Sequence, residues 1–290
     1  MPEVKTSDGR TLAYEQQGDP NGVPVFVLHG TPGSRLSGLH PDPEKVSRAG
    51  LRLISYDRPG YGRSTRQHGR SVVDCAGDIA TIADALGIER FAVTGSSGGG
   101  PHALAAAARL PERVTRAECN VGPAPYEADG LDYFEGMDPE NVEEVEWSLA
   151  GEQKLVPELE REAQRALERI DRDPAALLEG FELSEADRAV LAQEVVRERI
   201  RISFREAMAQ GVGGWADDDL AFIRPWGFEL DEIDVPVQVR YGAGDVLVPA
   251  GHGAWLGAHV PRAVVHVDDV AGHMSTPDES LERIRAFVAG

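Results

Sequence analysis

The sequence has little cysteine: 290 residues contain only Cys75 and Cys119. A disulfide framework needs more cysteines, and a structural zinc site needs closely spaced Cys or His ligands. Neither pattern is present. We therefore interpret both cysteines as small buried apolar residues and expect no metal site.

Long apolar runs are also missing. No stretch approaches the roughly 20 residues that a membrane-spanning helix requires. The first ten residues, MPEVKTSDGR, lack the basic start and apolar centre of a secretion signal. We expect a soluble cytoplasmic protein that does not act at a membrane.

Positive charge is scarce, with 29 Lys and Arg against 49 Asp and Glu, a net charge of −20. Binding to nucleic acid needs basic surface that displaces counterions, so we expect no nucleic-acid partner. Residues 126–200 hold much of the excess, with 22 acidic and 8 basic residues. We interpret this segment either as a set of solvated helix faces or as a negatively charged surface that attracts cationic substrates.

Strand and helix patterns alternate through residues 1–125. Two alternating runs around Asp8-Gly9 predict an antiparallel hairpin. The apolar runs VPVFVLHG, LRLISYD and RFAVTG predict buried strands, and residues 72–86 predict a helix that ends at Gly87. This alternation predicts an α/β fold with a mostly parallel central sheet and helices on both faces.

Residues 126–224 contain no convincing strand and predict an inserted set of amphipathic helices, broken near Pro157, Asp173-Pro174 and Gly211–Gly214. In residues 225–290, VPVQVRYG and AVVHVDD resume the buried-strand pattern, and DESLERIRAFVAG predicts a closing helix. The predicted organisation is a core of residues 1–125 and 225–290 with a helical insertion of residues 126–224.

The segment FAVTGSSGGGPHAL places G-x-S-x-G, residues 95–99, between a predicted buried strand and a predicted helix. Such a sharp strand-to-helix turn strains its central residue and needs small neighbours. The central residue is Ser97, and we interpret it as a nucleophile. Centring the turn on Ser96 fits less well, and a phosphate-binding loop would need a following Lys.

A serine nucleophile needs a base, and the base needs an orienting acid. His273 follows the predicted strand AVVHV, and Asp245 follows VPVQVRY. The order Ser97, Asp245, His273 matches the Ser, acid, His order of one fold family. The competing acids are Glu127, Asp268 and Asp269. The remaining histidines are interpreted as packing or surface residues: His40, His68, His102, His252, His259 and His266.

The reaction also needs two backbone N–H groups that stabilise an oxyanion. Gly98 follows the nucleophile and supplies one. The loop LHGTPGS follows an earlier predicted strand, and we expect Thr31 to supply the other. His29 and Gly30 shape this loop, with His29 acting as a hydrogen-bonding brace.

With these residues in place, the chain resembles the α/β-hydrolase fold superfamily. The motifs HGTPG, YDRPGYGRS, GSSGGG, GAGD and AGHMS occur in the order and spacing of that superfamily's core motifs. The resemblance implies that the helical insertion is a cap domain that covers the active site and supplies much of the substrate pocket. It also implies catalysis without a cofactor.

Within the superfamily, HGTPG is similar to the HGGPG of proline iminopeptidases, which recognise a free N-terminal amine through cap carboxylates. The chain departs from them in two places. Thr31 replaces a glycine, and Gly98 stands where those enzymes usually carry a bulky aromatic. A glycine there is closer to general esterases and lactonases. Dehalogenases and epoxide hydrolases of this fold use a carboxylate nucleophile, which Ser97 argues against.

Three functions stay open. The first is a serine hydrolase that cleaves a small ester, thioester or lactone through an acyl-Ser97 intermediate. The second is an iminopeptidase-like aminopeptidase, and the third is a non-catalytic ligand-binding protein of the same fold. The sequence leaves both a monomer and a homodimer open. Candidate substrate-binding residues are His29, Gly30, Arg35, Tyr133, Phe134, Trp147, Phe181 and Trp215.

Overall fold

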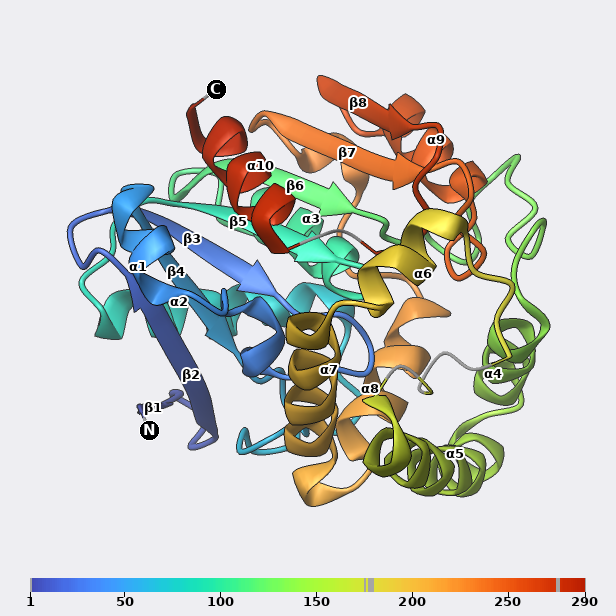
Figure 1. Ribbon diagram of the computed structural model, residues 1–290. Coiled ribbons are helices and arrows are strands. Elements are labelled where there is room, and N and C mark those ends of the chain that lie inside the picture. The colour runs from blue at the N-terminus through green and yellow to red at the C-terminus, as the bar shows by residue number, and fades with distance from the viewer. Residues whose placement is uncertain (1, 175, 177–179, 275–276, 290) are drawn as a thin grey trace.

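The computed structural model describes residues 2–174, 176, 180–274 and 277–289 (Figure 1). The described chain contains an eight-stranded sheet in the order β1-β2-β4-β3-β5-β6-β7-β8. The strands are β1 (Glu3–Lys5), β2 (Thr11–Gly18), β3 (Val23–Leu28), β4 (Leu51–Tyr56), β5 (Phe91–Ser96), β6 (Val114–Asn120), β7 (Val237–Gly242) and β8 (Ala263–Asp268).

The sheet is parallel from β4 to β8, whereas β1 and β2 are antiparallel to their neighbours. The hairpin predicted around Asp8-Gly9 is confirmed, because Lys5 of β1 pairs with Thr11 of β2. Gly9 adopts φ +89°, a conformation that glycine reaches at little cost. The expected α/β architecture is therefore present.

Helices cover both faces of the sheet. The α-helices are α1 (Pro43–Arg48), α2 (Cys75–Ala85), α3 (Gly99–Arg109), α4 (Pro139–Leu149), α5 (Glu152–Arg172), α6 (Glu185–Leu191), α7 (Glu194–Ala207), α8 (Gly213–Phe222), α9 (Ala250–His259) and α10 (Pro277–Ala289). Short 3₁₀ helices are η1 (Arg35–Gly38), η2 (Val72–Asp74), η4 (Met208–Gln210) and η5 (Leu230–Glu232). Helices α2, α3 and α9 share one apolar core with the sheet, and α1 and α10 form the core on its other face.

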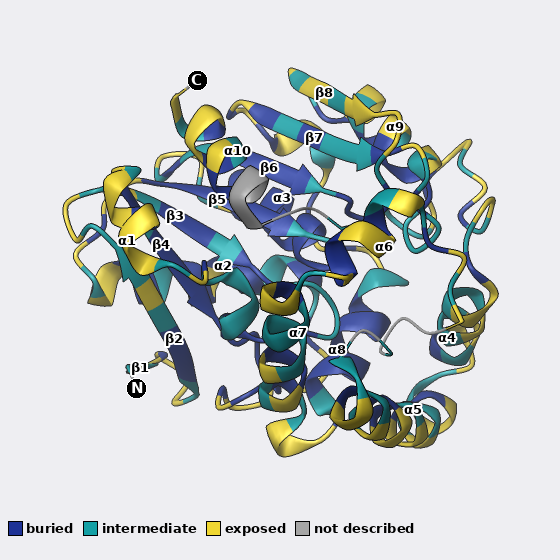
Figure 2. Ribbon diagram, viewed as in Figure 1, coloured by how far each residue is buried: buried dark blue, intermediate teal, exposed yellow. Residues whose placement is uncertain are grey.

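The prediction that residues 263–268 form a buried strand is wrong in one respect. Strand β8 forms, but it lies at the edge of the sheet, and among the described strands it pairs only with β7 (Figure 2). Val264 and Val267 are 54% and 50% exposed. The closing helix α10 instead packs through Leu281, Ile284 and Phe287 in the core formed with β3 and β4, so it leaves β8 uncovered. An apolar run alone does not distinguish a central strand from an edge strand.

Helices α4 to α8 all lie between β6 and β7 in the sequence, and α4, α5, α7 and α8 share a second apolar cluster that also includes Tyr61. Helix α5 ends at Arg172, as the Asp173-Pro174 pair predicted. The break expected at Pro157 is wrong, because α5 continues through it. A proline inside a helix removes one hydrogen bond, but the burial of Leu155 and Leu159 in the cluster offsets that loss.

Two acids of α5 pair with basic residues of the same helix. Lys154 and Arg161 both contact Glu158, and Arg165 contacts Glu162. Exposed pairs of this kind contribute a few tenths of a kcal/mol each. This pairing fits the interpretation of a solvated helix face. Among the described helices, none combines the length and the apolar character needed to cross a membrane.

Candidate active site

The turn after β5 holds Ser97 in a strained backbone conformation, with φ +55°. The glycines around it explain how the turn closes. A Cβ atom on Gly95 would overlap the backbone carbonyl of Gly99, and a Cβ on Gly99 would overlap the carbonyl of Leu28. The Ser97 N–H donates to the Asn120 carbonyl at 2.9 Å. A non-glycine residue at such φ costs about 1–3 kcal/mol and persists where its surroundings hold it, a pattern concentrated at functional sites.

Ser96 is the last residue of β5, and its hydroxyl accepts a hydrogen bond from the Asn120 side chain at 3.2 Å. The strained position thus belongs to Ser97.

His273 and Asp245 are joined directly. The His273 Nδ1 lies 2.7 Å from Asp245 Oδ2. The other carboxylate oxygen of Asp245 accepts the N–H groups of Leu247 and Val248, both at 2.9 Å. The Asp245 carboxylate is therefore held on one side by its own loop and aimed at the imidazole on the other. This arrangement places the proton on Nδ1 and leaves Nε2 free to accept one.

The competing acids lie elsewhere. Glu127 and Asp269 are exposed. Asp268 accepts the N–H groups of Val270 and Ala271 within its own turn, each at 3.0 Å. Asp245 is the carboxylate that meets the His273 ring.

The pKa of His273 is raised above its ordinary value. Burial alone would lower this pKa, but the charge and hydrogen bond of Asp245, together with the charge of Asp187, outweigh it. An acid partner that stabilises the imidazolium also favours a transition state in which the imidazole gains a proton.

The topology brings these loops to one edge of the sheet. Ser97 follows β5, Asp245 follows β7 and His273 follows β8, and these strands run in parallel. Figure 1 shows the carboxyl ends of the strands pointing toward helices α6, α7 and α8. In open α/β sheets this edge is where ligands bind.

The loop after β3 lies against the nucleophile turn. A Cβ on Gly30 would lie 3.3 Å from Ser97 Cβ and 3.8 Å from its Oγ. A Cβ on Gly98 would overlap Thr31 Oγ1. The two expected oxyanion donors, Thr31 and Gly98, are therefore adjacent.

A buried carboxylate from the insertion supports this loop. Asp218 of α8 is 0% exposed, and its oxygens contact Arg58 at 2.7 Å, Arg70 at 2.6 Å, Tyr61 at 2.9 Å and Thr31 Oγ1 at 2.8 Å. Although burial alone would raise it, the two guanidinium groups hold the pKa of Asp218 well below its usual range.

His29 braces the same loop, as expected. Its Nδ1 lies 2.7 Å from the Gly30 carbonyl, and its Nε2 accepts the Arg58 N–H at 3.2 Å. Burial and the charge of Arg58 lower the pKa of His29 well below its usual value, so the ring is neutral. The Arg58 side chain also donates to the carbonyls of His29 and Gly30.

His102 is fully buried beside the turn. Its Nδ1 lies 2.7 Å from the Gly98 carbonyl, and its ring meets Phe222 edge-on. Burial lowers the pKa of His102 to about 3. This is the packing role expected of it.

Arg35 does not lie free for a substrate. It is 1% exposed and contacts Asp57 and Glu206, each at 2.6 Å. A substrate carboxylate would have to displace partners already in place. We therefore correct the expectation that Arg35 binds substrate and assign it to the scaffold.

The aromatic candidates of the insertion divide into two groups. Tyr133 and Phe134 cluster with Tyr126, at ring distances of 5.1–6.3 Å, and Tyr133 meets His252 edge-on at 4.6 Å. Trp147 and Trp215 instead belong to the apolar cluster of the inserted helices. Phe181 is half-buried just after residues outside the described chain.

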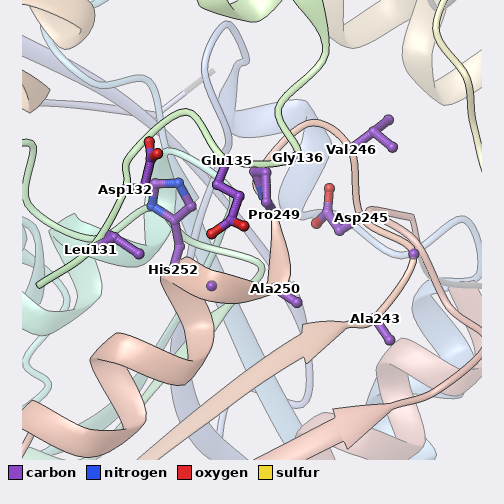
Figure 3. A pocket seen from close by; sticks show the side chains of 12 residues that line it. Leu131, Asp132, Glu135, Gly136, Ala243, Asp245, Val246, Pro249, Ala250 and His252 are labelled. Atoms are coloured by element: carbon purple, nitrogen blue, oxygen red, sulfur yellow. The ribbon is translucent and has the colours of Figure 1, made fainter.

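A pocket of about 340 Å³ lies beside the acid loop (Figure 3). It is lined by residues 131, 132, 135 and 136 and by residues 243–246 and 249–252. Figure 3 shows Glu135 and His252 on one side of it and Asp245 on the other. The pocket is therefore lined in part by the candidate acid.

Sequence reasoning missed two features of α8, its buried acids and Phe222. It gave Asp217, Asp218 and Asp219 no role, yet they are 1%, 0% and 7% exposed. Phe222, one turn further on, has a ring atom 3.1 Å from the position of a Cβ on Gly98. Three consecutive acids beside apolar residues were the available signal, but the contacts of Asp218 with the buried Arg58 and Arg70 are visible only in the structure.

Asp219 and Glu144 form a second carboxylate site. The two side chains interact, and the Trp215 indole N–H donates to Glu144 at 2.8 Å. Burial, together with the charge of Glu144, raises the pKa of Asp219 well above its usual value, and burial raises that of Glu144 to about 7. Asp219 Oδ2 has no hydrogen-bond partner among the described residues. Two carboxyls in such contact share a proton.

Residues 23–280 match the family model described as the alpha/beta hydrolase fold, and the chain belongs to this family. It is 26% identical to a proline iminopeptidase of Xanthomonas citri, with 97% of this chain and 93% of that protein aligned. It is 27% identical to a 2-hydroxy-6-oxononadienedioate/2-hydroxy-6-oxononatrienedioate hydrolase of Burkholderia vietnamiensis, over 97% and 91% of the two chains.

A shorter match is 40% identical to a proline iminopeptidase of Xylella fastidiosa, but it covers 37% of this chain and only 35% of that relative. Among solved structures, the enol-lactonase from Burkholderia xenovorans LB400 superposes with a TM-score of 0.71 at 22% identity, over all of both chains. That likeness shows the fold. The chain is thus an enzyme of the alpha/beta hydrolase class, and its relatives carry the names of different enzymes.

Proposed function

We propose that the protein is a cofactor-independent serine hydrolase that cleaves a small ester, thioester or lactone through an acyl-Ser97 intermediate. The observation that carries the proposal is the 2.7 Å contact of His273 with Asp245, on the sheet edge where Ser97 stands strained beside Thr31 and Gly98.

In the proposed first step, Ser97 Oγ attacks the carbonyl carbon while His273 Nε2 takes the hydroxyl proton. The carbonyl oxygen becomes an oxyanion that accepts the N–H groups of Thr31 and Gly98. The carbon–oxygen or carbon–sulfur bond then breaks, and His273 returns the proton to the leaving alcohol or thiol. Water attacks the acyl-Ser97 ester by the same route and releases the acid.

The environment of Gly98 supports an ester or lactone over a peptide bond. Thr31 and Phe222 occupy the space that a side chain at position 98 would fill. The aromatic that proline iminopeptidases usually carry after the nucleophile therefore has no room here.

Steady-state kinetics on short-chain aryl esters, thioesters, lactones and proline or alanine arylamides tests the proposal. We expect kcat/KM to be highest within the ester and lactone group, and Ser97→Ala to abolish turnover. A Ser97→Ala variant that keeps most of the wild-type rate would refute the nucleophile assignment.

An aminopeptidase is the second candidate, because Glu144 and Asp219 could receive a substrate amine. Asp219 lies three residues before Phe222 on α8, so the two share the helix face that meets Gly98. A bound ammonium would be a cation beside two carboxyls, and it would lower the pKa of both.

Glu144→Gln and Asp219→Asn test this alternative, with Glu146→Gln on the exposed face of α4 as the matched control. If the pair binds an amine, KM for proline arylamides rises in both variants and KM for neutral esters does not. Equal effects on both substrate types would exclude a specific amine site.

A further inference from the structure

Asp187 of α6 contacts the His273 loop with both carboxylate oxygens. Its Oδ2 accepts the His273 N–H at 2.9 Å, and its Oδ1 accepts the Met274 N–H at 2.8 Å. The side chain is 1% exposed. Hydrogen bonds from N–H groups to a buried carboxylate are stronger than those between neutral groups.

The local sequence does not explain this contact. Ser184-Glu185-Ala186-Asp187 is a capping-box pattern, in which the fourth side chain would bond back to the N–H of the first residue. Ser184 caps α6 by accepting the Asp187 N–H at 3.0 Å. The Asp187 carboxylate instead turns outward to the His273 loop.

The neighbouring glycines fit this contact closely. A Cβ on Gly272 would overlap Asp187 Oδ2 and lie 2.8 Å from Ser184 Oγ. Gly244, beside Asp245, donates its N–H to the Ala271 carbonyl at 3.0 Å. The start of α6, the acid loop and the base loop are thus packed together, and Figure 1 shows α6 beside the end of β7.

The two aspartates hold different parts of the base. Asp245 fixes the ring through Nδ1, and Asp187 fixes the backbone from which the ring projects. Among the described residues, these two aspartates are also the charged groups that raise the pKa of His273. The ring orientation needs both, because a hydrogen bond to one ring atom leaves the Cα position undetermined.

We infer that Asp187 is a positioning residue for the reaction of Ser97, because it holds the backbone of His273. Helix α6 of the insertion must therefore lie in its observed place for His273 to act as the base. This inference rests on the proposed serine-hydrolase function. It assigns part of the catalytic geometry to the insertion, which sequence reasoning limited to substrate choice.

The test compares Asp187→Asn with Glu185→Gln, an exposed acid on the same helix. Asparagine has one acceptor oxygen, so one backbone N–H loses its partner and the charge disappears. We expect kcat/KM for an aryl ester to fall about tenfold or more, mostly in kcat, the loss of about one charge-assisted hydrogen bond. The acidic limb of the pH–rate profile should move to lower pH, and Glu185→Gln should change neither.

Gly272→Ala provides a second variant in case Asp187→Asn folds poorly. Its methyl group pushes the carboxylate away but keeps the charge, so kcat should fall with a smaller shift of the acidic limb. Wild-type kinetics in Asp187→Asn would overturn the inference. The inference would also be overturned if kcat falls only because the variant is less stable, while the acidic limb of the pH–rate profile does not move.

An NMR titration of the His273 ring separates this inference from the proposed function. If the wild-type protein cleaves no ester, the proposed function fails, and the ring titration alone decides the role of Asp187. A lower His273 pKa in Asp187→Asn than in the wild type supports the contact. An unchanged pKa refutes it.

Discussion

Replacing Asp218 by Asn should destabilise the protein far more than replacing its neighbour Asp217. Asp218 faces Arg58 and Arg70, which are 1% and 3% exposed, so their charges would stay buried without the carboxylate that contacts both. Breaking a buried ion pair costs about 3–5 kcal/mol. Asp217 pairs with Arg66, whose side chain is 36% exposed and can regain water. Loss of that pair should cost about 1 kcal/mol or less.

Urea unfolding followed by tryptophan fluorescence measures both variants. The expected loss for Asp218→Asn is a large part of a typical stability of about 5–15 kcal/mol. Thr31→Val is a milder variant that removes the two hydrogen bonds of the Thr31 hydroxyl, to Asp218 and from Arg58, at about 1 kcal/mol each. If Asp218→Asn costs no more than Asp217→Asn, the buried network does not stabilise the fold as we argue.

The pH dependence of stability gives an independent check on Asp218. Its pKa is lower in the folded chain than in the unfolded chain. Its stabilising contribution is therefore complete above about pH 4 and is lost as the pH falls toward the folded-state pKa. Below about pH 4, wild-type stability should fall more steeply than that of Asp218→Asn.

The other predictions concern the base, the oxyanion loop and the insertion. Because the pKa of His273 is raised, ester kcat/KM should rise with pH through a value above about 6.5, and Asp245→Asn should lower kcat by orders of magnitude; a profile flat from pH 5 to 8 would contradict this. Gly98→Ala should lower kcat/KM by displacing Thr31, and Thr31→Gly should restore part of it in the double variant; additive losses in that cycle would exclude the contact. Trp215→Ala should cost about 3–5 kcal/mol in urea unfolding but leave the ranking of acyl chain lengths unchanged, whereas a changed ranking would place this residue in the pocket.

Much of the core could be predicted from the sequence, because its signals are local. Buried strands read as apolar runs, and the glycines around Ser97 reveal a turn in which side chains would overlap backbone. The contact of His273 with Asp245 followed from their places after parallel strands. The rival Glu127 could be set aside only when the structure showed it exposed.

The insertion could be predicted only as helices. Nothing in the sequence pairs Asp218 with Arg58 or Asp187 with His273, since these contacts join residues far apart in the chain. The sequence also misplaced Arg35, because a basic residue near a predicted oxyanion loop gives no sign of the carboxylates that the fold brings to it. The exposure of β8 depends on where α10 packs, which is a property of the tertiary fold.

Reaction with a fluorophosphonate probe, followed by peptide mapping, tests the central claim most directly. The probe phosphonylates a serine only where base and oxyanion donors activate it. We predict one probe per chain, attached to Ser97, with no labelling of Ser97→Ala and slow labelling of Asp245→Asn. The account would be contradicted if the wild-type protein is not labelled, as expected of a non-catalytic ligand-binding protein. It would also be contradicted if the label is attached to another residue.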